Sequence, residues 1–326
     1  MLKKVITLFH LVIMLIVSTA HAELRKTKSA DAICNDGQQA AFTYFSAPSR
    51  KWFIMVEGGG LAYNVQSYRN RPQHLKSPIS DKNYGKWSPI AKDFDEKGYN
   101  ILVIPHCSSD MHQGFQTHQI DGTDVPFHGR KIWEDIFAQF DAQLTEAEQI
   151  VIVGWSAGGV GISFNIDLLA KYENLYVVID SSWADKESQR VQYGWAGFNY
   201  QAERKFSFAN IPAHCKQGWD RCFPSRALFD LHGVKHVFPI WNKGDRHAEY
   251  GSNPKMRKYT HEDIDYYGAG FSVDAKKRQL KGFEENNWGH VMTVNDLYHR
   301  KVEGLSVAQL IGNWVEGRAP SKLVLD

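Results

Sequence analysis

The sequence contains little that would tie the protein to a membrane interior or to a polyanion. Beyond the N-terminal apolar run, no stretch is apolar enough over the roughly 20 residues that a membrane span takes. The 38 Lys and Arg residues nearly balance the 36 Asp and Glu residues, and no basic stripe or acidic tail stands out. This balance argues against nucleic acid or a charged surface as the main partner.

Cysteine is also scarce, with 4 in the 326 residues. No Cys/His pair has zinc-ligand spacing together with a second pair to complete a site, so we expect no metal. Four cysteines allow three disulfide connectivities. Cys215 and Cys222 are close together in a polar, glycine-containing segment, which favours the pairs Cys215–Cys222 and Cys34–Cys107. The alternative is that some of the cysteines are free and buried.

The first 22 residues are typical of a secretory signal peptide. Lys3 and Lys4 form a charged start, an apolar run follows, and Ala20-His21-Ala22 is a small-x-small cleavage site. Without those two lysines the 38 basic residues fall to 36, equal to the 36 acidic ones, so the formal charge is zero. We expect residues 23–326 to form a single exported domain, periplasmic or secreted, in a compartment that permits disulfides.

A single stretch indicates chemistry. The β-branched run at residues 151–153 ends at Gly154-Trp155-Ser156-Ala157-Gly158, and small residues then open a helical-looking segment, residues 161–171. This is the strand–turn–helix pattern of a nucleophile elbow. The glycines would remove collisions around Ser156 in the sharp turn, and the N–H of Ala157 would point to where an oxyanion forms. Gly-x-Ser-x-Gly also occurs by chance, but both flanking elements favour the catalytic interpretation.

Apolar runs alternate with helical patterns along the rest of the chain. The patterns predict strands at 40–45, 51–56, 99–105, 175–180 and 234–241, and helices at 129–144 and 305–314. Buried, β-branched strands between helices imply a mainly parallel sheet with helices on both faces, in an α/β-hydrolase fold. Residues 63–87 are predicted to make a long surface excursion, and residues 190–226 a small cap or lid insertion.

A serine hydroxyl is a weak nucleophile and needs a base that is itself oriented by an acid. In α/β-hydrolases the partners follow the serine in the order acid, then histidine. Asp245 follows the strand predicted at 234–241, and His290 lies in a loop farther along the chain. Asp180, which ends the strand at 175–180, is the rival for the acid.

The strand at 51–56 runs directly into Glu57-Gly58-Gly59-Gly60. Three successive glycines let a backbone bend with its N–H groups exposed, and α/β-hydrolases use such a loop to supply further oxyanion donors. The loop after the strand at 99–105 carries His112, Gln113, Gly114 and His118, which are candidates to line a cleft. The expected chemistry requires no cofactor.

Several motifs together resemble the pectin acetylesterase/Notum family. They are the segment from Val56 to Gly60, the run His106-Cys107-Ser108-Ser109-Asp110, and the segment from Gly154 to Gly159. The opening residues 32–37 and the closing residues 305–318 are also similar to that family. The resemblance implies an α/β-hydrolase with a Ser-Asp-His triad that removes acetyl or longer acyl groups from carbohydrate or protein.

Carried over by motif, the family's nucleophile matches Ser156, its oxyanion donors match Gly58, Gly59 and Ala157, and its acid matches Asp245. The resemblance therefore favours Asp245 over Asp180. Two departures, Leu61-Ala62 after the glycines and Trp155 before the serine, change the expected wall of the acyl pocket. Substrate identity consequently does not transfer.

Three functional hypotheses follow. The first is an exported serine esterase that removes acetyl or another short acyl group from a carbohydrate, so that its partner is an acylated carbohydrate or small ester. The second is a lipase-like or polyester-cleaving esterase with the same triad. The third is an inactive hydrolase fold used for binding, which the intact candidates Ser156, Asp245 and His290 argue against.

Overall fold

The structure is a computed structural model, and it describes residues 21–182, 232–242, 265–266, 269–271, 290–301 and 304–318. Several expectations lie outside these residues: most of the leader, the cap at 190–226, the acid Asp245, and the pair Cys215–Cys222.

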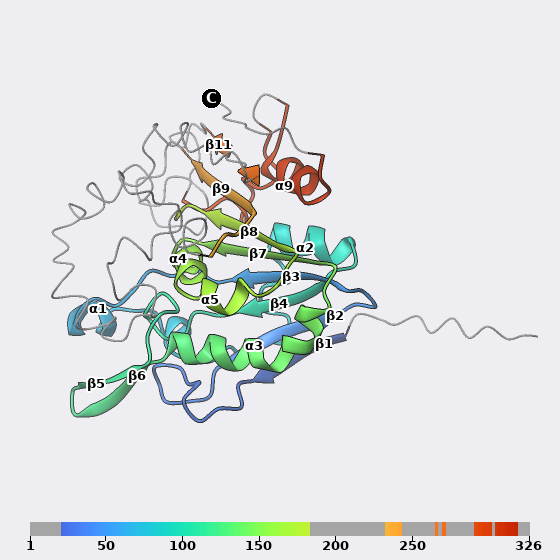
Figure 1. Ribbon diagram of the computed structural model, residues 1–326. Helices are drawn as coiled ribbons and strands as arrows, with labels where there is room; N and C mark the ends of the chain where they lie inside the picture. Colours follow the sequence, from blue (N-terminus) through green and yellow to red (C-terminus); the bar gives the residue numbers. More distant parts are fainter. Residues whose placement is uncertain are drawn as a thin grey trace, which may run out of the picture.

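A mixed β-sheet carries the fold (Figure 1). Its order is β1-β2-β4-β3-β7-β8-β9-β10, and β11 also pairs with β9. The first two pairings are antiparallel, and all pairings from β4 onward are parallel. The strands are β1 (His21–Lys26), β2 (Ala41–Ser46), β3 (Lys51–Val56), β4 (Asn100–Ile104), β7 (Gln149–Trp155), β8 (Leu175–Asp180), β9 (His236–Asn242), β10 (Asp265–Tyr266) and β11 (Ala269–Phe271).

Helices cover both faces of the sheet (Figure 1). The helices α3 (Gly129–Thr145), α4 (Ala157–Phe164) and α5 (Ile166–Leu169) pack on one face, and α2 (Pro89–Glu96) and α9 (Val307–Val315) pack on the other. Successive side chains of a strand point to opposite faces, so each central strand contributes to both cores. In β3, Ile54 belongs to the α3–α5 core, whereas Phe53 and Met55 belong to the α2–α9 core.

The sheet register brings three loops to one edge. Val56 at the end of β3 pairs with Gly154 of β7, and Trp155 of β7 pairs with Asp180 at the end of β8. Because these strands are parallel, the loops that follow them leave the sheet on the same side. Ligands of open α/β sheets bind at this carboxyl edge.

The predicted strands are confirmed with small shifts of their ends, and the helices at 129–144 and 305–314 are confirmed as α3 and α9. The helix expected at 161–171 was placed wrongly. It begins at Ala157 and ends at Phe164, because the Asn165 side chain donates to the carbonyls of Gly161 and His112 and breaks the run. A separate short helix, α5, follows.

The elements that were not predicted include strand β1, helix α2, the short strands β10 and β11, and the hairpin of β5 (Gln116–Ile120) and β6 (Thr123–Phe127). Helix α2 has 8 residues and begins at Pro89, after the N-cap residue Ser88, whose side chain accepts a hydrogen bond from Ala91 N–H. The excursion at 63–87 contains the short helix α1 (Val65–Arg69) and a 3₁₀ turn, Gln73–Leu75.

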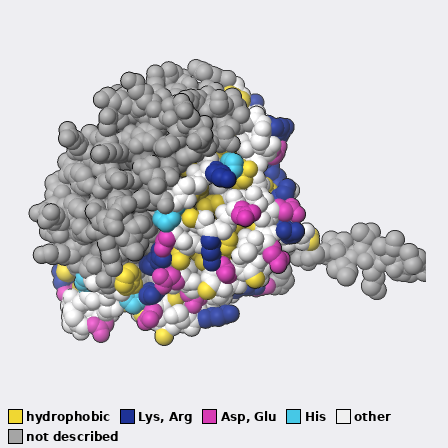
Figure 2. Space-filling view, in the orientation of Figure 1, with side chains coloured by type: hydrophobic (Ala, Val, Ile, Leu, Met, Phe, Trp, Pro, Cys, Tyr) yellow, Lys and Arg dark blue, Asp and Glu magenta, His cyan; other side chains and the backbone are white. Residues whose placement is uncertain are grey.

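Charges of both signs are interspersed over the described part of the face seen in Figure 2. None of the described helices has the length and apolar character that a membrane crossing requires.

The disulfide Cys34–Cys107 is confirmed, with its two Cα atoms 5.0 Å apart and both residues fully buried. It joins residues 73 positions apart in the sequence. Asn35 strengthens the junction, since its backbone N–H donates to Cys107 O and its side chain donates to Ser108 O. The loop that follows β4 is therefore fastened to the start of the chain.

Removing this bond by Cys34→Ser/Cys107→Ser is expected to lower the free energy of unfolding by about 4 kcal/mol, because a closed loop of this length restricts the unfolded chain. Urea unfolding followed by tryptophan fluorescence measures the loss. The single Cys34→Ser variant, which also lacks the bond, should lose a similar amount, and an unchanged midpoint in the double variant would contradict the prediction.

Candidate active site

Ser156 occupies a strained turn between β7 and α4. Its φ is 52° and its ψ is −123°, values that a residue with a side chain adopts at a cost of about 1–3 kcal/mol and keeps only when the surroundings impose them. The surroundings do so here. Ser156 N–H donates to Asp180 O at 2.8 Å, and Ser156 O accepts from the N–H groups of Gly159 and Val160. The residue is partly exposed at the tip of β7.

The glycines beside the serine are required by close backbone approach. A Cβ on Gly154 would come 2.6 Å from the backbone of Gly158, and a Cβ on Gly158 would overlap Val56 O. Real Cβ atoms essentially never approach other atoms so closely. The elbow glycines therefore act as the sequence pattern predicts, and they let α4 pack directly against the end of β3.

The glycine loop after β3 lies against the elbow. A Cβ on Gly58 would come 2.7 Å from both the side chain and the carbonyl oxygen of Trp155. Gly59 and Gly60 have φ values of 128° and 66°, which favour glycine. Ala157 begins α4, and the N–H groups of a helix's first turn have no acceptor within the helix. The predicted oxyanion donors Gly58, Gly59 and Ala157 are thus on adjoining segments.

His290 stands at the beginning of a segment that is fastened to the end of β8. Val291 N–H donates to Ser181 Oγ at 3.0 Å, and Met292 N–H donates to Asp180 Oδ2 at 2.8 Å. The N–H and the hydroxyl of Thr293 both donate to the same oxygen at 2.7 Å. Since Asp180 O also accepts from Ser156 N–H, these contacts bring the His290 segment to the edge of the sheet that carries the serine.

Asp180, the rival acid, is fully buried and bonded on both carboxylate oxygens. Its Oδ1 accepts from Ser181 Oγ at 2.9 Å, and its Oδ2 accepts three hydrogen bonds from Met292 and Thr293. A carboxylate offers about four acceptor positions, so these bonds nearly fill it. Burial raises the pKa of Asp180, and the hydrogen bonds from Thr293, Met292 and Ser181 oppose that rise. Asp180 thus anchors the segment that carries His290.

Strain also marks the residue next to His290. Val291 has a φ of 69°, which is rare for a β-branched residue. Its N–H bond to Ser181 Oγ and the neighbouring bonds to Asp180 hold it there. Contacts with the end of β8 therefore hold strained backbone both at the serine and beside the histidine candidate.

Two residues expected to line a cleft are buried instead: His112 is 1% exposed and Gln113 is fully covered. His112 lies beneath the glycine loop, where its Nε2–H donates to Glu57 O at 2.8 Å. His106 lies beside it, with the two ring centroids 4.6 Å apart. Thr293 also holds Asp180, and nothing in the local sequence around Thr293 reveals a bond to a residue so far away.

The acidity of Glu57, which precedes the glycine loop, is strongly altered. Burial raises the pKa of its carboxyl group to about 8, although the N–H of His106 donates to it at 2.8 Å and opposes the shift. The carboxyl group is therefore mostly neutral at pH 7. Among the described residues, no three His, Cys, Asp or Glu side chains gather as metal ligands would.

The strand order and the helices on both faces define an α/β-hydrolase-like fold, in which the strained serine occupies the sharp turn between β7 and α4. Residues 16–222, which are more than half of the chain, match the pectinacetylesterase family. The chain belongs to that family, as the motifs indicated.

Named relatives agree with this placement. The palmitoleoyl-protein carboxylesterase notum2 of Xenopus laevis is 26% identical over 237 residues, which are 64% of this chain and 48% of the relative. The palmitoleoyl-protein carboxylesterase NOTUM of Drosophila melanogaster is 27% identical over 228 residues, which are 59% of this chain and 34% of the relative. The chain thus spans about half the length or less of these curated relatives.

The fold is similar to a solved structure of the Wnt deacylase Notum from Drosophila. The TM-score is 0.63 at 20% identity, and the match covers 94% of this chain and 95% of that one. At this identity the likeness concerns the fold.

The anchor at Asp180 can be tested through Thr293. Thr293→Val keeps the shape of the side chain but removes the hydroxyl, and it is expected to lower the free energy of unfolding by about 1.5–3 kcal/mol because the lost bond is to a charged group. Urea unfolding measures this loss, and hydrogen exchange of the amides of residues 291–293 should quicken. Thr293→Ser, which keeps the hydroxyl, is the matched control, and an equal loss in both variants would refute the anchor.

Proposed function

We propose that this protein is a serine carboxylesterase in which Ser156 is the nucleophile, His290 the general base and Asp245 the acid. The N–H groups of Gly58, Gly59 and Ala157 would hold the oxyanion. The observation that carries the proposal is the strained φ of Ser156, at the start of α4 and beside a glycine loop. Strained backbone of this kind clusters at the active sites of proteins.

The roles follow from the chemistry of acyl transfer. His290 takes the proton of Ser156 as the hydroxyl attacks the ester carbonyl, and Asp245 stabilises the imidazolium that forms. The tetrahedral oxyanion is held by N–H groups that are already oriented, so little reorganisation is needed during the reaction. His290 then protonates the leaving alcohol, and water repeats the sequence on the acyl-enzyme.

The contacts of Asp180 support Asp245 as the acid. Asp180 already accepts bonds from Ser181, Met292 and Thr293, so it has little capacity left for an imidazole N–H. The chain order Ser, Asp, His agrees with the order in α/β-hydrolases for either residue. The resemblance of the segment Asn242–Asp245 to the family's acid motif also favours Asp245 over Asp180.

For the substrate, we propose acetyl or another short acyl group on a carbohydrate. The name of the pectinacetylesterase family supports this class. A longer acyl chain is the second candidate, because the curated relatives are named palmitoleoyl-protein carboxylesterases. Export to the periplasm or beyond fits the leader and the Cys34–Cys107 disulfide, since disulfides persist in oxidising compartments.

Ser156→Ala is expected to lower kcat for nitrophenyl acetate by at least about 10³-fold, because the covalent intermediate cannot form. It should also abolish labelling by a fluorophosphonate probe. Ser163→Ala removes a serine from the same helix, where the hydroxyl bonds Gly159 O, and should keep both properties. Equal labelling of the wild type and the Ser156 variant would overturn the proposal.

Two assays separate the substrate candidates. Nitrophenyl esters of increasing acyl length should show an optimum at short chains, and acetylated polysaccharides should release acetate in a Ser156-dependent way. An optimum at long chains would favour the second candidate and exclude the first.

The proposed activity should decline above about pH 8 because Glu57 then ionises. Its neutral form prevails below its raised pKa of about 8, and above that pH a negative charge lies beside the loop that would receive the oxyanion. A profile of kcat/KM against pH should therefore fall on the alkaline side. Glu57→Gln, which stays neutral, should remove the fall, whereas Glu96→Gln on the exposed side of α2 should leave it in place. An alkaline fall that survives in Glu57→Gln would contradict this assignment.

A further inference from the structure

Three successive carbonyl groups of the glycine loop are each held by a side chain. Glu57 O accepts from His112 Nε2 at 2.8 Å, Gly58 O accepts from His106 Nδ1 at 3.2 Å, and Gly59 O accepts from an Arg71 guanidinium nitrogen at 2.8 Å. The two histidines are 1% exposed or less, and their rings lie side by side at a tilt beneath the loop. A flexible run of glycines is thereby given one conformation.

The hydrogen bonds also fix which ring nitrogen carries the proton. Met111 N–H donates to His106 Nε2 at 3.1 Å, so that nitrogen is the acceptor and Nδ1 carries the hydrogen that Gly58 O receives. In His112 the nitrogen that faces Glu57 O must be the donor, which is Nε2. Burial, above all, lowers the pKa of both rings, that of His112 to about 4, so both are neutral.

The geometry of the peptide links these bonds to the oxyanion donors. A trans peptide is planar, and its C=O and N–H point in opposite directions. The structure has no cis peptide bond among the described residues. When His112 holds Glu57 O, the N–H of Gly58 is turned to the other side, and the bond from His106 to Gly58 O does the same for the N–H of Gly59.

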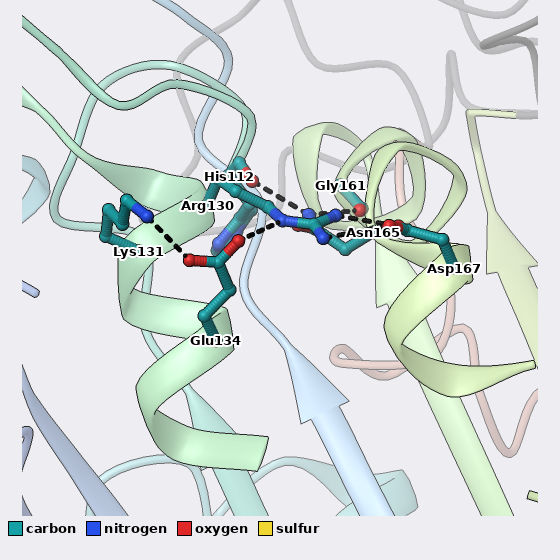
Figure 3. Close-up of polar contacts among 7 residues, drawn as sticks. All are labelled: His112, Arg130, Lys131, Glu134, Gly161, Asn165 and Asp167. Atoms are coloured by element: carbon teal, nitrogen blue, oxygen red, sulfur yellow. Dashed lines mark hydrogen bonds and ion pairs between the residues drawn. The ribbon is translucent and has the colours of Figure 1, made fainter. Parts of the chain in front are cut away.

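Contacts with α4 and with Asn165, the residue that follows α4, hold His112 in place (Figure 3). Its carbonyl accepts from Asn165 Nδ2 at 2.8 Å, and the same Asn165 nitrogen donates to Gly161 O. A Cβ on Gly161 would come 2.9 Å from the His112 side chain, so only a glycine lets the ring approach α4. His112 has a φ of 65°, and its N–H donates to Asp110 Oδ1 at 3.0 Å.

The ion pairs around Asn165 support this placement. Figure 3 shows Arg130 of α3 reaching across to Asp167 of α5, with Glu134 on its other side. Arg130 also lies 3.4 Å from the Asn165 side-chain oxygen, which leaves the Asn165 amide nitrogen directed at His112 O. The position of His112 is thus connected to α4, the helix that directly follows Ser156.

We propose that His106 and His112 are positioning residues for the oxyanion hole: as neutral donors they hold Gly58 O and Glu57 O and so direct the N–H groups of Gly59 and Gly58 to the acyl substrate. This rests on the proposed esterase function. The two rings touch neither substrate nor reacting atoms, and their effect is expected on the stability of the tetrahedral state.

His106 donates through Nδ1 and His112 donates through Nε2. The same pair of substitutions, to asparagine and to glutamine, should therefore have opposite effects at the two positions. An asparagine amide nitrogen lies at the place of Nδ1, whereas a glutamine amide nitrogen lies closer to the place of Nε2. His106→Asn and His112→Gln should therefore keep the bonds, and His106→Gln and His112→Asn should lose them. If the two rings only filled space, the more active of the Asn and Gln variants would not be a different one at each position.

The experiment measures kcat and KM for nitrophenyl acetate in all four variants and in the wild type. The bond-losing variants should show kcat reduced by about 10- to 100-fold with KM little changed, since oxyanion stabilisation acts in the transition state. They should also bind a trifluoromethyl ketone, which forms a tetrahedral adduct with the serine, more weakly by a similar factor. His299→Asn, at an exposed position that pairs with Asp93, is the control for loss of a histidine.

The outcomes separate this inference from the proposed function. A wild type without esterase activity or probe labelling would refute the function. An active wild type in which Asn and Gln have equal effects at each position would overturn the inference and leave the function standing. Urea midpoints of the four variants show whether each is folded, and since each pair differs by one methylene, unequal kcat at equal midpoints supports the inference.

Discussion

The architecture of the site depends on the hydrogen bonds that the buried carboxylate of Asp110 accepts. Its Oδ1 accepts from Ser108 Oγ and His112 N–H, and its Oδ2 accepts from the N–H groups of Gly114 and Gly129. Burial raises the pKa of Asp110, and these bonds act in the opposite direction. An unpaired buried charge costs several kcal/mol, so the loop is forced to supply all its donors at once. That requirement keeps His112 at a positive φ, under the glycine loop.

A second buried aspartate, Asp180, holds the segment on the other side of the serine. Asp180 ends β8, receives the Ser156 N–H on its backbone oxygen, and binds the segment after His290 with its carboxylate. The two carboxylates therefore fix the surroundings of the glycine loop and of the candidate base. The serine between them depends on neither charge directly, but its strained turn is stable only while both neighbouring segments keep their places.

Local patterns predicted the central strands, because β-branched runs such as residues 151–153 are buried on both faces of a parallel sheet and leave a strong signal. They also predicted the elbow, because close packing at Gly154 and Gly158 excludes any side chain there. The end of α4 was not predicted, because it depends on a hydrogen bond from the Asn165 side chain to the carbonyl of His112 on a distant loop. In the unpredicted hairpin β5–β6, the first strand is polar and only its last residue is buried, so it lacks the apolar run that marks the central strands.

By itself the sequence determined the order of the central strands and of helices α3 and α9, the family, and the residue types that the chemistry needs: Ser156 between its glycines, the glycine loop after β3, and candidates for base and acid. These depend on local sterics and hydrogen bonding, which short segments encode. Tertiary structure alone decided that Asp180 anchors the His290 segment, that His112 lies under the glycine loop rather than in a cleft, and that the loop's carbonyls face inward. Such roles arise from pairings between residues many tens of positions apart, and nothing in the local sequence around either partner specifies them.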